Sequence, residues 1–312
     1  YEMGEVMASG GAKQVIFNAM FCTLNPEDEV IIPSPYWVSY PDITKLCDGR
    51  PVIVQCQQSD QFKIQPEQLR RAISAKTKWL ILNSPNNPTG AVYSQEELRS
   101  LSKVLLDHPK VLVLCDDIYE HIVYDSDTFA TLAAVEPRLK DRTLIVNGVS
   151  KAYAMTGWRI GYSAGPKWLI SAMTKLQGQS TTCPSSISQS AAAAALQGDQ
   201  NIILEWREIY RARRDCSAGA LKNIEGLNAM VPDGGFYLFV DCNELIHKEG
   251  ASNAGIKNDI DLVEYLLRST QVVLVPGSEF GLSNYFRLCF ARTTDVLTLA
   301  LEKISNACKR LN

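Results

Sequence analysis

Short apolar segments rich in β-branched residues alternate with helical patterns through residues 1–200. Each apolar segment is a continuous run, which predicts strands covered on both faces. Ser94 and Glu97 lie three residues apart at the start of a helical pattern and predict an N-terminal capping box. The predicted strands cover 29–32, 51–56, 78–85, 111–117 and 143–150, and the predicted helices include 11–24, 66–75 and 94–107. This alternation predicts a mostly parallel sheet with helices on both sides.

The last hundred or so residues follow a different pattern. A long charged helical pattern over 202–223 precedes three strand-like pieces that are separated by helical patterns. These pieces cover 234–241, 271–280 and 285–291. We therefore predict an α/β fold with a large three-layer α/β/α domain over 1–205 and a smaller C-terminal α/β domain over 206–312. The smaller domain begins with the long linking helix.

Composition excludes several classes of protein. Of 312 residues, 46% are apolar and 21% are charged, which is typical of a globular chain and not of a disordered or fibrous one. The formal charge is only −3, and no helix-turn-helix or basic segment stands out, so we expect no nucleic-acid partner. No apolar run approaches the roughly 20 residues that span a bilayer, so we expect no membrane partner.

The cysteines and histidines suggest neither disulfides nor a metal site. The nine cysteines are scattered without a CxxC pair, and the three histidines stand alone. Metal sites need such residues at short, regular spacing, so we predict none here. Single cysteines in apolar segments, such as Cys115, indicate reduced thiols and a cytoplasmic protein.

Polar clusters follow three of the predicted strands: SPNNPTG, DDIY and GVSK. In open parallel sheets ligands bind at the carboxyl ends of strands, so these clusters should meet in one crevice. Asp116 follows an apolar run and should be half-buried and in need of a cationic partner. Lys151, with Arg159 eight residues later, could be a Schiff-base nucleophile. Burial and the nearby positive charge would lower the pKa of its amine. Taken singly, a lysine or an aspartate is far more often a solvated or capping residue.

Six motifs in order identify a resemblance. They are SGGAKQ, PSPYW, NSPNNPTG, DDIY, SKAYAMTGWRIG and YFRL. Together they resemble the class I, fold-type I aminotransferases that depend on pyridoxal 5'-phosphate, and most of all the bacterial aspartate aminotransferase subgroup. The likeness extends over the whole chain. It implies a transaminase that shuttles an amino group by a ping-pong mechanism.

The resemblance implies a role for five residues around the cofactor ring. Lys151 would hold pyridoxal phosphate as a Schiff base and then transfer a proton from the substrate Cα. Asp116 would pair with the pyridine nitrogen and keep it protonated. Tyr119 and Asn87 would hydrogen-bond the phenolic oxygen and so lower the imine pKa. Trp37 would stack on the ring face.

It also implies a seat for the phosphate at the start of a helix. Backbone N–H groups at Gly11, Ala12 and Lys13 would face the anion, because the helix dipole favours negative charge there. Arg159 would pair with the phosphate as a charged fork, and Ser150 would add a hydroxyl. Without Arg159, the glycines before the helix would pass for an ordinary turn.

Substrate preference follows from two further basic residues. Arg287 resembles the arginine that grips the substrate α-carboxylate, a structural ion pair being the alternative. The stretch 176–184 lacks the arginine that one aspartate-specific group uses for the distal carboxylate. Lys13 is then the candidate for that carboxylate, or else a solvent-facing lysine. The expected substrates are the small molecules aspartate and 2-oxoglutarate, with aromatic or prephenate-type substrates as an alternative.

The same cofactor motifs occur in proteins that catalyse a different reaction or none. A carbon–sulfur lyase or cyclopropane-forming synthase of the same fold, and a non-catalytic regulatory module, would share them. Family members carry an N-terminal arm before the phosphate loop, with a tyrosine that reaches the phosphate across a homodimer interface. The chain opens at Tyr1, almost at that loop, and we expect the arm to belong to the complete protein.

Overall fold

A computed structural model describes residues 1–125 and 129–312 and contains two sheets. The larger sheet has seven strands in the order β1-β7-β6-β5-β4-β2-β3. Strands β3, β2, β4, β5 and β6 run parallel, whereas β7 is antiparallel to both β6 and β1. Its strands are β1 (Val6–Ser9), β2 (Glu29–Ser34), β3 (Arg50–Gln55), β4 (Thr77–Asn83), β5 (Leu112–Asp116), β6 (Thr143–Gly148) and β7 (Gly161–Ala164).

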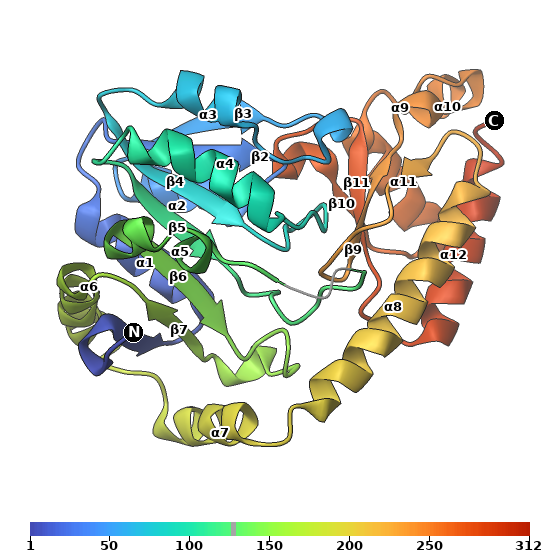
Figure 1. Cartoon of the computed structure of the whole chain (residues 1–312). Coiled ribbons are helices and arrows are strands. Elements are labelled where there is room, and N and C mark those ends of the chain that lie inside the picture. Colours follow the sequence, from blue (N-terminus) through green and yellow to red (C-terminus); the bar gives the residue numbers. More distant parts are fainter. Residues whose placement is uncertain (126–128) are drawn as a thin grey trace.

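Helices cover both faces of this sheet and make the three layers that the sequence predicts (Figure 1). One face packs against α1 (Ala12–Thr23), α2 (Ser39–Leu46) and α6 (Lys167–Ser180). The other packs against α3 (Pro66–Ala72), α4 (Gln95–Leu106) and α5 (Leu132–Val135). Ser94 caps α4 and exchanges hydrogen bonds with Glu97, so the predicted capping box is confirmed. The α/β fold class is therefore confirmed.

Burial along the strands follows from their place in the sheet. Every residue of the central strand β5 is buried, as its continuous apolar run predicts. The edge strand β3 differs, because its residues are exposed or half-buried and Ile53 is 40% exposed. The prediction of full cover on both faces is therefore wrong for this strand. As the last strand of the sheet, β3 lies where helices cover it less completely.

The second sheet is antiparallel and belongs to the C-terminal part of the chain. Its order is β10-β11-β9-β8, with strands β8 (Asn228–Ala229), β9 (Tyr237–Asp241), β10 (Val275–Pro276) and β11 (Tyr285–Cys289). The predicted strand over 271–280 is mostly wrong, since only Val275 and Pro276 pair and a 3₁₀ turn follows at Gly277–Phe280. Proline cannot donate to a ladder, so it confines this piece to a short edge strand.

A long helix leads from the first sheet towards the second (Figure 1). It is α8 (Asn201–Lys222), close to the predicted 202–223, and it packs with α12 over the core of the second sheet. The division into domains at residue 205 remains a prediction. The remaining helices are α7 (Ser186–Gln197), α9 (Asn243–Ile246), α10 (Glu249–Asn253), α11 (Asp259–Thr270) and α12 (Thr294–Cys308). Among the described residues, no helix combines the length and the apolarity that crossing a membrane requires.

Candidate active site

The carboxyl ends of β4, β5 and β6 meet the start of α1 and the strand β11 around a cavity of about 330 Å³. All of the predicted site residues except Gly11 line it, and Gly11 is the N-cap of α1 beside it. The predicted residues that line the cavity are Ala12, Lys13, Trp37, Asn87, Asp116, Tyr119, Ser150, Lys151, Arg159 and Arg287. Clusters far apart in the sequence therefore do converge.

The start of α1 gathers positive charge. Gly11 has φ of 106°, and a Cβ there would overlap the Arg159 guanidinium, so only glycine fits. Arg159 donates to the carbonyls of Gly10 (3.2 Å) and Thr156 (2.9 Å), which hold it against this helix end. The N-terminal N–H groups of a helix lack partners within the helix and carry its positive pole. A guanidinium at that pole is unfavourable unless an anion joins them, so this corner is built for an anion.

Lys151 is held among aromatic rings. Its Nζ lies 5.6 Å from the ring centre of Tyr119 and 5.7 Å from that of Phe236. Burial lowers the pKa of the amine, nearby Arg287 and Arg159 lower it further, and Asp116 opposes them. No ion pair is formed by Lys151 among the described residues. The amine is thus closer to its neutral, nucleophilic form than a surface lysine.

Asp116 is more deeply buried than the sequence predicts, at 5% exposed rather than half-buried. Its carboxylate accepts hydrogen bonds from the Tyr40 hydroxyl (2.6 Å) and the Ile118 amide (3.4 Å). The expected cationic partner is not in contact with it within the described part of the chain. Burial raises the Asp116 pKa to about 6, with the two hydrogen bonds and the charge of Lys151 opposing. The carboxylate therefore lacks a positive charge beside it.

Arg287 joins the second sheet to the cavity. Its Nη1 donates to Oδ1 of Asn87 (2.8 Å), and its guanidinium carbon lies 4.3 Å and 4.9 Å from the ring centres of Tyr237 and Phe280. The backbone of Asn87 is itself fixed, because its main-chain N–H donates to Oδ1 of Asn83. No carboxylate pairs with Arg287 among the described residues, so the structural ion pair kept as an alternative is not formed there. Its remaining donors can take a carboxylate.

Lys13 and Trp37 form another side of the cavity. The Lys13 Nζ lies 4.8 Å from the Trp37 ring centre, although the lysine remains exposed. Trp37 is half-buried and packs edge-on against Tyr40. The lysine is therefore placed over the cavity wall, where a distal acidic group could reach it.

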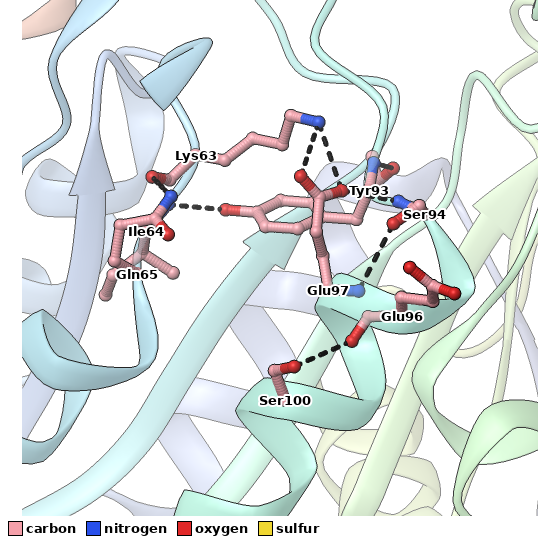
Figure 2. A network of polar contacts seen from close by, with 9 residues as sticks. Lys63, Ile64, Gln65, Tyr93, Ser94, Glu96, Glu97 and Ser100 are labelled. Atoms are coloured by element: carbon pink, nitrogen blue, oxygen red, sulfur yellow. Dashed lines mark hydrogen bonds and ion pairs between the residues drawn. The ribbon is translucent and has the colours of Figure 1, made fainter. Parts of the chain in front are cut away.

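A polar network fixes the loop around Lys63 against the start of α4 (Figure 2). The buried Lys63 ammonium pairs with both Glu97 oxygens at 2.8 Å and 3.0 Å, and the Tyr93 hydroxyl accepts from the Ile64 amide at 2.9 Å. Both contacts fix the loop against the start of α4. Phe62, on the same loop, packs in one apolar cluster with Phe280. The network thus supports the ring that covers one side of the Arg287 guanidinium.

Six residues that line the cavity were not predicted from the sequence, and three of them form side-chain hydrogen bonds with predicted residues. These three are Tyr40 on α2, Asn83 at the end of β4 and Tyr237 on β9. Asn83 opens the NSPNNPTG motif, and its position at a strand end was a usable signal. Tyr40 and Tyr237 lie in ordinary helical and strand patterns, which carry no such signal.

Comparison with known proteins decides the family. The family model "Aminotransferase class I and II" matches residues 1–304. The chain belongs to the class I and II aminotransferases. It is 51% identical to an aspartate aminotransferase of Rhizobium meliloti, over the whole chain and 76% of that protein. It is 48% identical to a probable aspartate/prephenate aminotransferase of Rickettsia bellii, covering 78% of that protein.

A solved structure agrees with this assignment. The crystal structure of the Rhizobium meliloti aspartate aminotransferase superposes with a TM-score of 0.96 at 52% identity, covering 99% of this chain and 78% of that one. The protein is thus a transaminase with small-molecule substrates, and aminotransferases of this class use pyridoxal phosphate.

The cavity fits pyridoxal phosphate. A phosphate suits the corner where Arg159 meets the start of α1, since both are positive and face the cavity. A pyridinium would supply the positive charge that the buried Asp116 carboxylate lacks. The amine of Lys151 lies in the same cavity, as a covalent link to an aldehyde requires.

Proposed function

We propose that this aminotransferase transfers the amino group of aspartate to 2-oxoglutarate. The observation that supports the proposal is one cavity that holds an amine, a buried carboxylate and two arginines, none of which forms an ion pair among the described residues. When bound, pyridoxal phosphate supplies an electron sink that makes a Cα–H bond of the substrate acidic. The remaining work falls to the side chains of the chain.

In this proposal Lys151 carries the cofactor and moves the proton. Its amine, once displaced by the amino group of the substrate, takes the proton from the substrate Cα. A lowered pKa suits this role, because a protonated ammonium cannot act as a base. Asp116 holds a proton on the ring nitrogen, and the hydroxyl of Tyr40 keeps the carboxylate oriented.

The remaining cofactor contacts come from the start of α1 and from the strand ends. Gly11, Ala12, Lys13 and Arg159, with the hydroxyl of Ser150, bind the phosphate. Tyr119 and Asn87 bind the phenolic oxygen, and Trp37 covers one face of the ring. The first turn of α1 and Trp37 lie close together, since the Nζ of Lys13 is 4.8 Å from the Trp37 ring centre, and this supports the arrangement.

The substrate is recognised through its carboxylates. Arg287 binds the α-carboxylate with the donors that Asn87 leaves free, and its contact with the Tyr237 ring holds the guanidinium in place. Lys13 binds the distal carboxylate of aspartate or 2-oxoglutarate. Prephenate or an aromatic substrate is a second candidate, because Trp37 offers an apolar face beside Lys13 and some relatives are named for both aspartate and prephenate.

We also propose that the enzyme acts as a homodimer in the cytoplasm. A groove of about 1030 Å³ adjoins the cavity and shares Lys13 and Arg159 with it. Exposed apolar side chains border it, among them Phe21 and Trp158, which a second copy would cover. All nine cysteines, each within the described residues, are free thiols, in keeping with a reducing compartment.

The decisive experiment is a half-reaction with the cofactor-loaded enzyme. Aspartate, glutamate, phenylalanine and alanine are each added alone, and the loss of the cofactor's visible absorbance is followed. We expect aspartate and glutamate to react fastest. The amount of 2-oxo acid formed should equal the amount of cofactor that loses its absorbance. Release of ammonia, pyruvate and a thiol from added cystathionine would instead indicate a carbon–sulfur lyase, and a spectrum that no amino acid changes would overturn the proposal.

A further inference from the structure

Tyr237 contacts two groups that come from different sheets. Its hydroxyl lies 3.1 Å from the hydroxyl of Tyr119, which follows β5. Its ring centre lies 4.3 Å from the guanidinium carbon of Arg287 on β11. Tyr237 pairs with Cys289 across β9 and β11, so it and Arg287 are diagonal neighbours on one face of that sheet. It also lines the cavity.

The hydrogen bond between the two hydroxyls can run in either direction. Each phenol carries a single proton, so each can donate once while accepting twice. Burial raises the pKa of both Tyr119 and Tyr237, so both protons remain in place at neutral pH. If the hydroxyl of Tyr119 donates its hydrogen bond to the phenolic oxygen of the cofactor, it cannot also donate to Tyr237. Tyr237 must then be the donor in the hydrogen bond between the two hydroxyls.

We infer that Tyr237 is a positioning residue that donates to Tyr119 with its hydroxyl and supports Arg287 with its ring. The inference rests on the roles proposed for Tyr119 and Arg287. A hydroxyl that accepts one hydrogen bond becomes a stronger donor in the next, so Tyr237 strengthens the bond from Tyr119 to the cofactor. One side chain then tunes the cofactor and holds the substrate clamp.

The test of the hydroxyl is a pH titration of the visible absorbance of the cofactor-loaded enzyme. We compare wild type, Tyr119→Phe and Tyr237→Phe, the last of which removes one oxygen and keeps the ring. The midpoint should rise in Tyr119→Phe, because the bond that favours the deprotonated imine is gone. In Tyr237→Phe it should rise by less, on the order of a few tenths of a pH unit, since cooperative strengthening is modest. The double variant should match Tyr119→Phe.

The sign of the shift separates the possibilities. A midpoint that falls in Tyr237→Phe would mean that Tyr119 donates to Tyr237 in the wild type. An unchanged midpoint would mean that Tyr237 has no influence on the cofactor. Either result overturns the inference about Tyr237 and leaves the proposed function standing. An unchanged midpoint in Tyr119→Phe overturns the role of Tyr119 as well. If Tyr237→Phe does not fold, 3-fluorotyrosine at position 237 takes its place. As a stronger donor it should lower the midpoint, and a rise or no change would contradict the inference.

The ring has its own test. Tyr237→Phe keeps a flat face for Arg287, whereas Tyr237→Leu removes it. We expect the KM for aspartate in Tyr237→Leu to exceed that in Tyr237→Phe by about threefold to thirtyfold, the range that a cation–π contact implies. Equal KM values in the two variants, with the cofactor absorbance retained, would show that the ring does not support Arg287.

Discussion

The cofactor half and the substrate half of the cavity are held in different ways. In the cofactor half, Arg159 bonds to two backbone carbonyls and Asp116 ends the fully buried strand β5. In the substrate half, Arg287 reaches in from the second sheet and is held by the Asn87 side chain and two aromatic rings. The first half is therefore built within one sheet and its helices, mainly on backbone groups, whereas the second depends on side-chain packing between two sheets.

This difference predicts two kinds of variant. Changes in the cofactor half should affect every substrate alike, because the electron sink is shared. Changes in the substrate half should alter the affinity for particular carboxylates and leave the cofactor spectrum intact. Tyr237 and Asn87 are the expected exceptions, because each contacts Arg287 and takes part in the proposed contact with the phenolic oxygen. A variant elsewhere with both effects would show that the two halves are not independent.

The largest effect is expected for Asp116→Ala. Without a charged partner the ring nitrogen loses its proton, so kcat should fall on the order of 10³-fold, as for loss of other preorganised charge partners. Steady-state rates with aspartate and with phenylalanine should fall by the same factor, and Asp116→Asn serves as the isosteric control. A loss confined to one substrate would place Asp116 in the substrate half.

The charge of Asp116 should also appear in the stability of the cofactor-free protein. Its folded pKa of about 6 lies above the ordinary value of 3.8, so its contribution to stability is fully present below pH 4 and is lost as pH rises through 6. Relative to Asp116→Asn, the free energy of unfolding of the wild type should fall by about 3 kcal/mol over that window. Denaturant unfolding at several pH values measures it.

Adding the cofactor should remove most of this decline, since a pyridinium stabilises the charged carboxylate. A decline of the same size with and without cofactor would mean that Asp116 does not meet the ring nitrogen.

In the substrate half, Arg287→Lys should reduce kcat/KM for aspartate by about 10²-fold, in line with the 2 kcal/mol or more that a disrupted buried charge pair costs. A lysine keeps the charge but not the planar fork or the stacking on Tyr237 and Phe280. Cofactor affinity, measured by absorbance titration, should be unchanged. Loss of cofactor binding would show that the two halves are not separable.

Lys13 tests whether the distal carboxylate is read at all. In Lys13→Ala the KM for aspartate should rise about fivefold, the effect of a solvent-accessible ion pair worth ~1 kcal/mol. The KM for phenylalanine should not change, and Lys13→Arg is the charge-preserving control. An equal rise for both donors would assign Lys13 to the cofactor half alone.

The smallest effect on catalysis is expected from the ion pair between Lys63 and Glu97. Glu97→Gln leaves the buried Lys63 ammonium without its charged partner, so the free energy of unfolding should fall by about 2 kcal/mol. Glu96, the preceding residue on the exposed side of α4, gives the matched control Glu96→Gln. Urea unfolding measures the stability of both variants. A loss of kcat in Glu97→Gln without a loss of stability would contradict a purely structural role for this ion pair.

The same division explains how much could be predicted. Asp116 and Lys151 stand in short motifs at the carboxyl ends of parallel strands, which geometry alone brings together, and Arg159 belongs to the same motif as Lys151. The central strands were equally visible, because buried parallel strands are continuous apolar runs.

Tyr40 and Tyr237 were missed for a physical reason. Tyr40 reaches Asp116 from α2, and Tyr237 reaches Tyr119 across two sheets. Neither contact leaves a local pattern, since both depend on how whole elements pack. The short β10 was overestimated because the apolar pattern over 271–280 outweighed the proline within it.

The proposed mechanism depends above all on which lysine holds the cofactor. To find it, the loaded enzyme is reduced with sodium borohydride, digested and analysed by mass spectrometry. We predict one phosphopyridoxyl group per chain, on Lys151. An adduct on Lys13, the other lysine that lines the cavity, or no adduct at all, would contradict the mechanism.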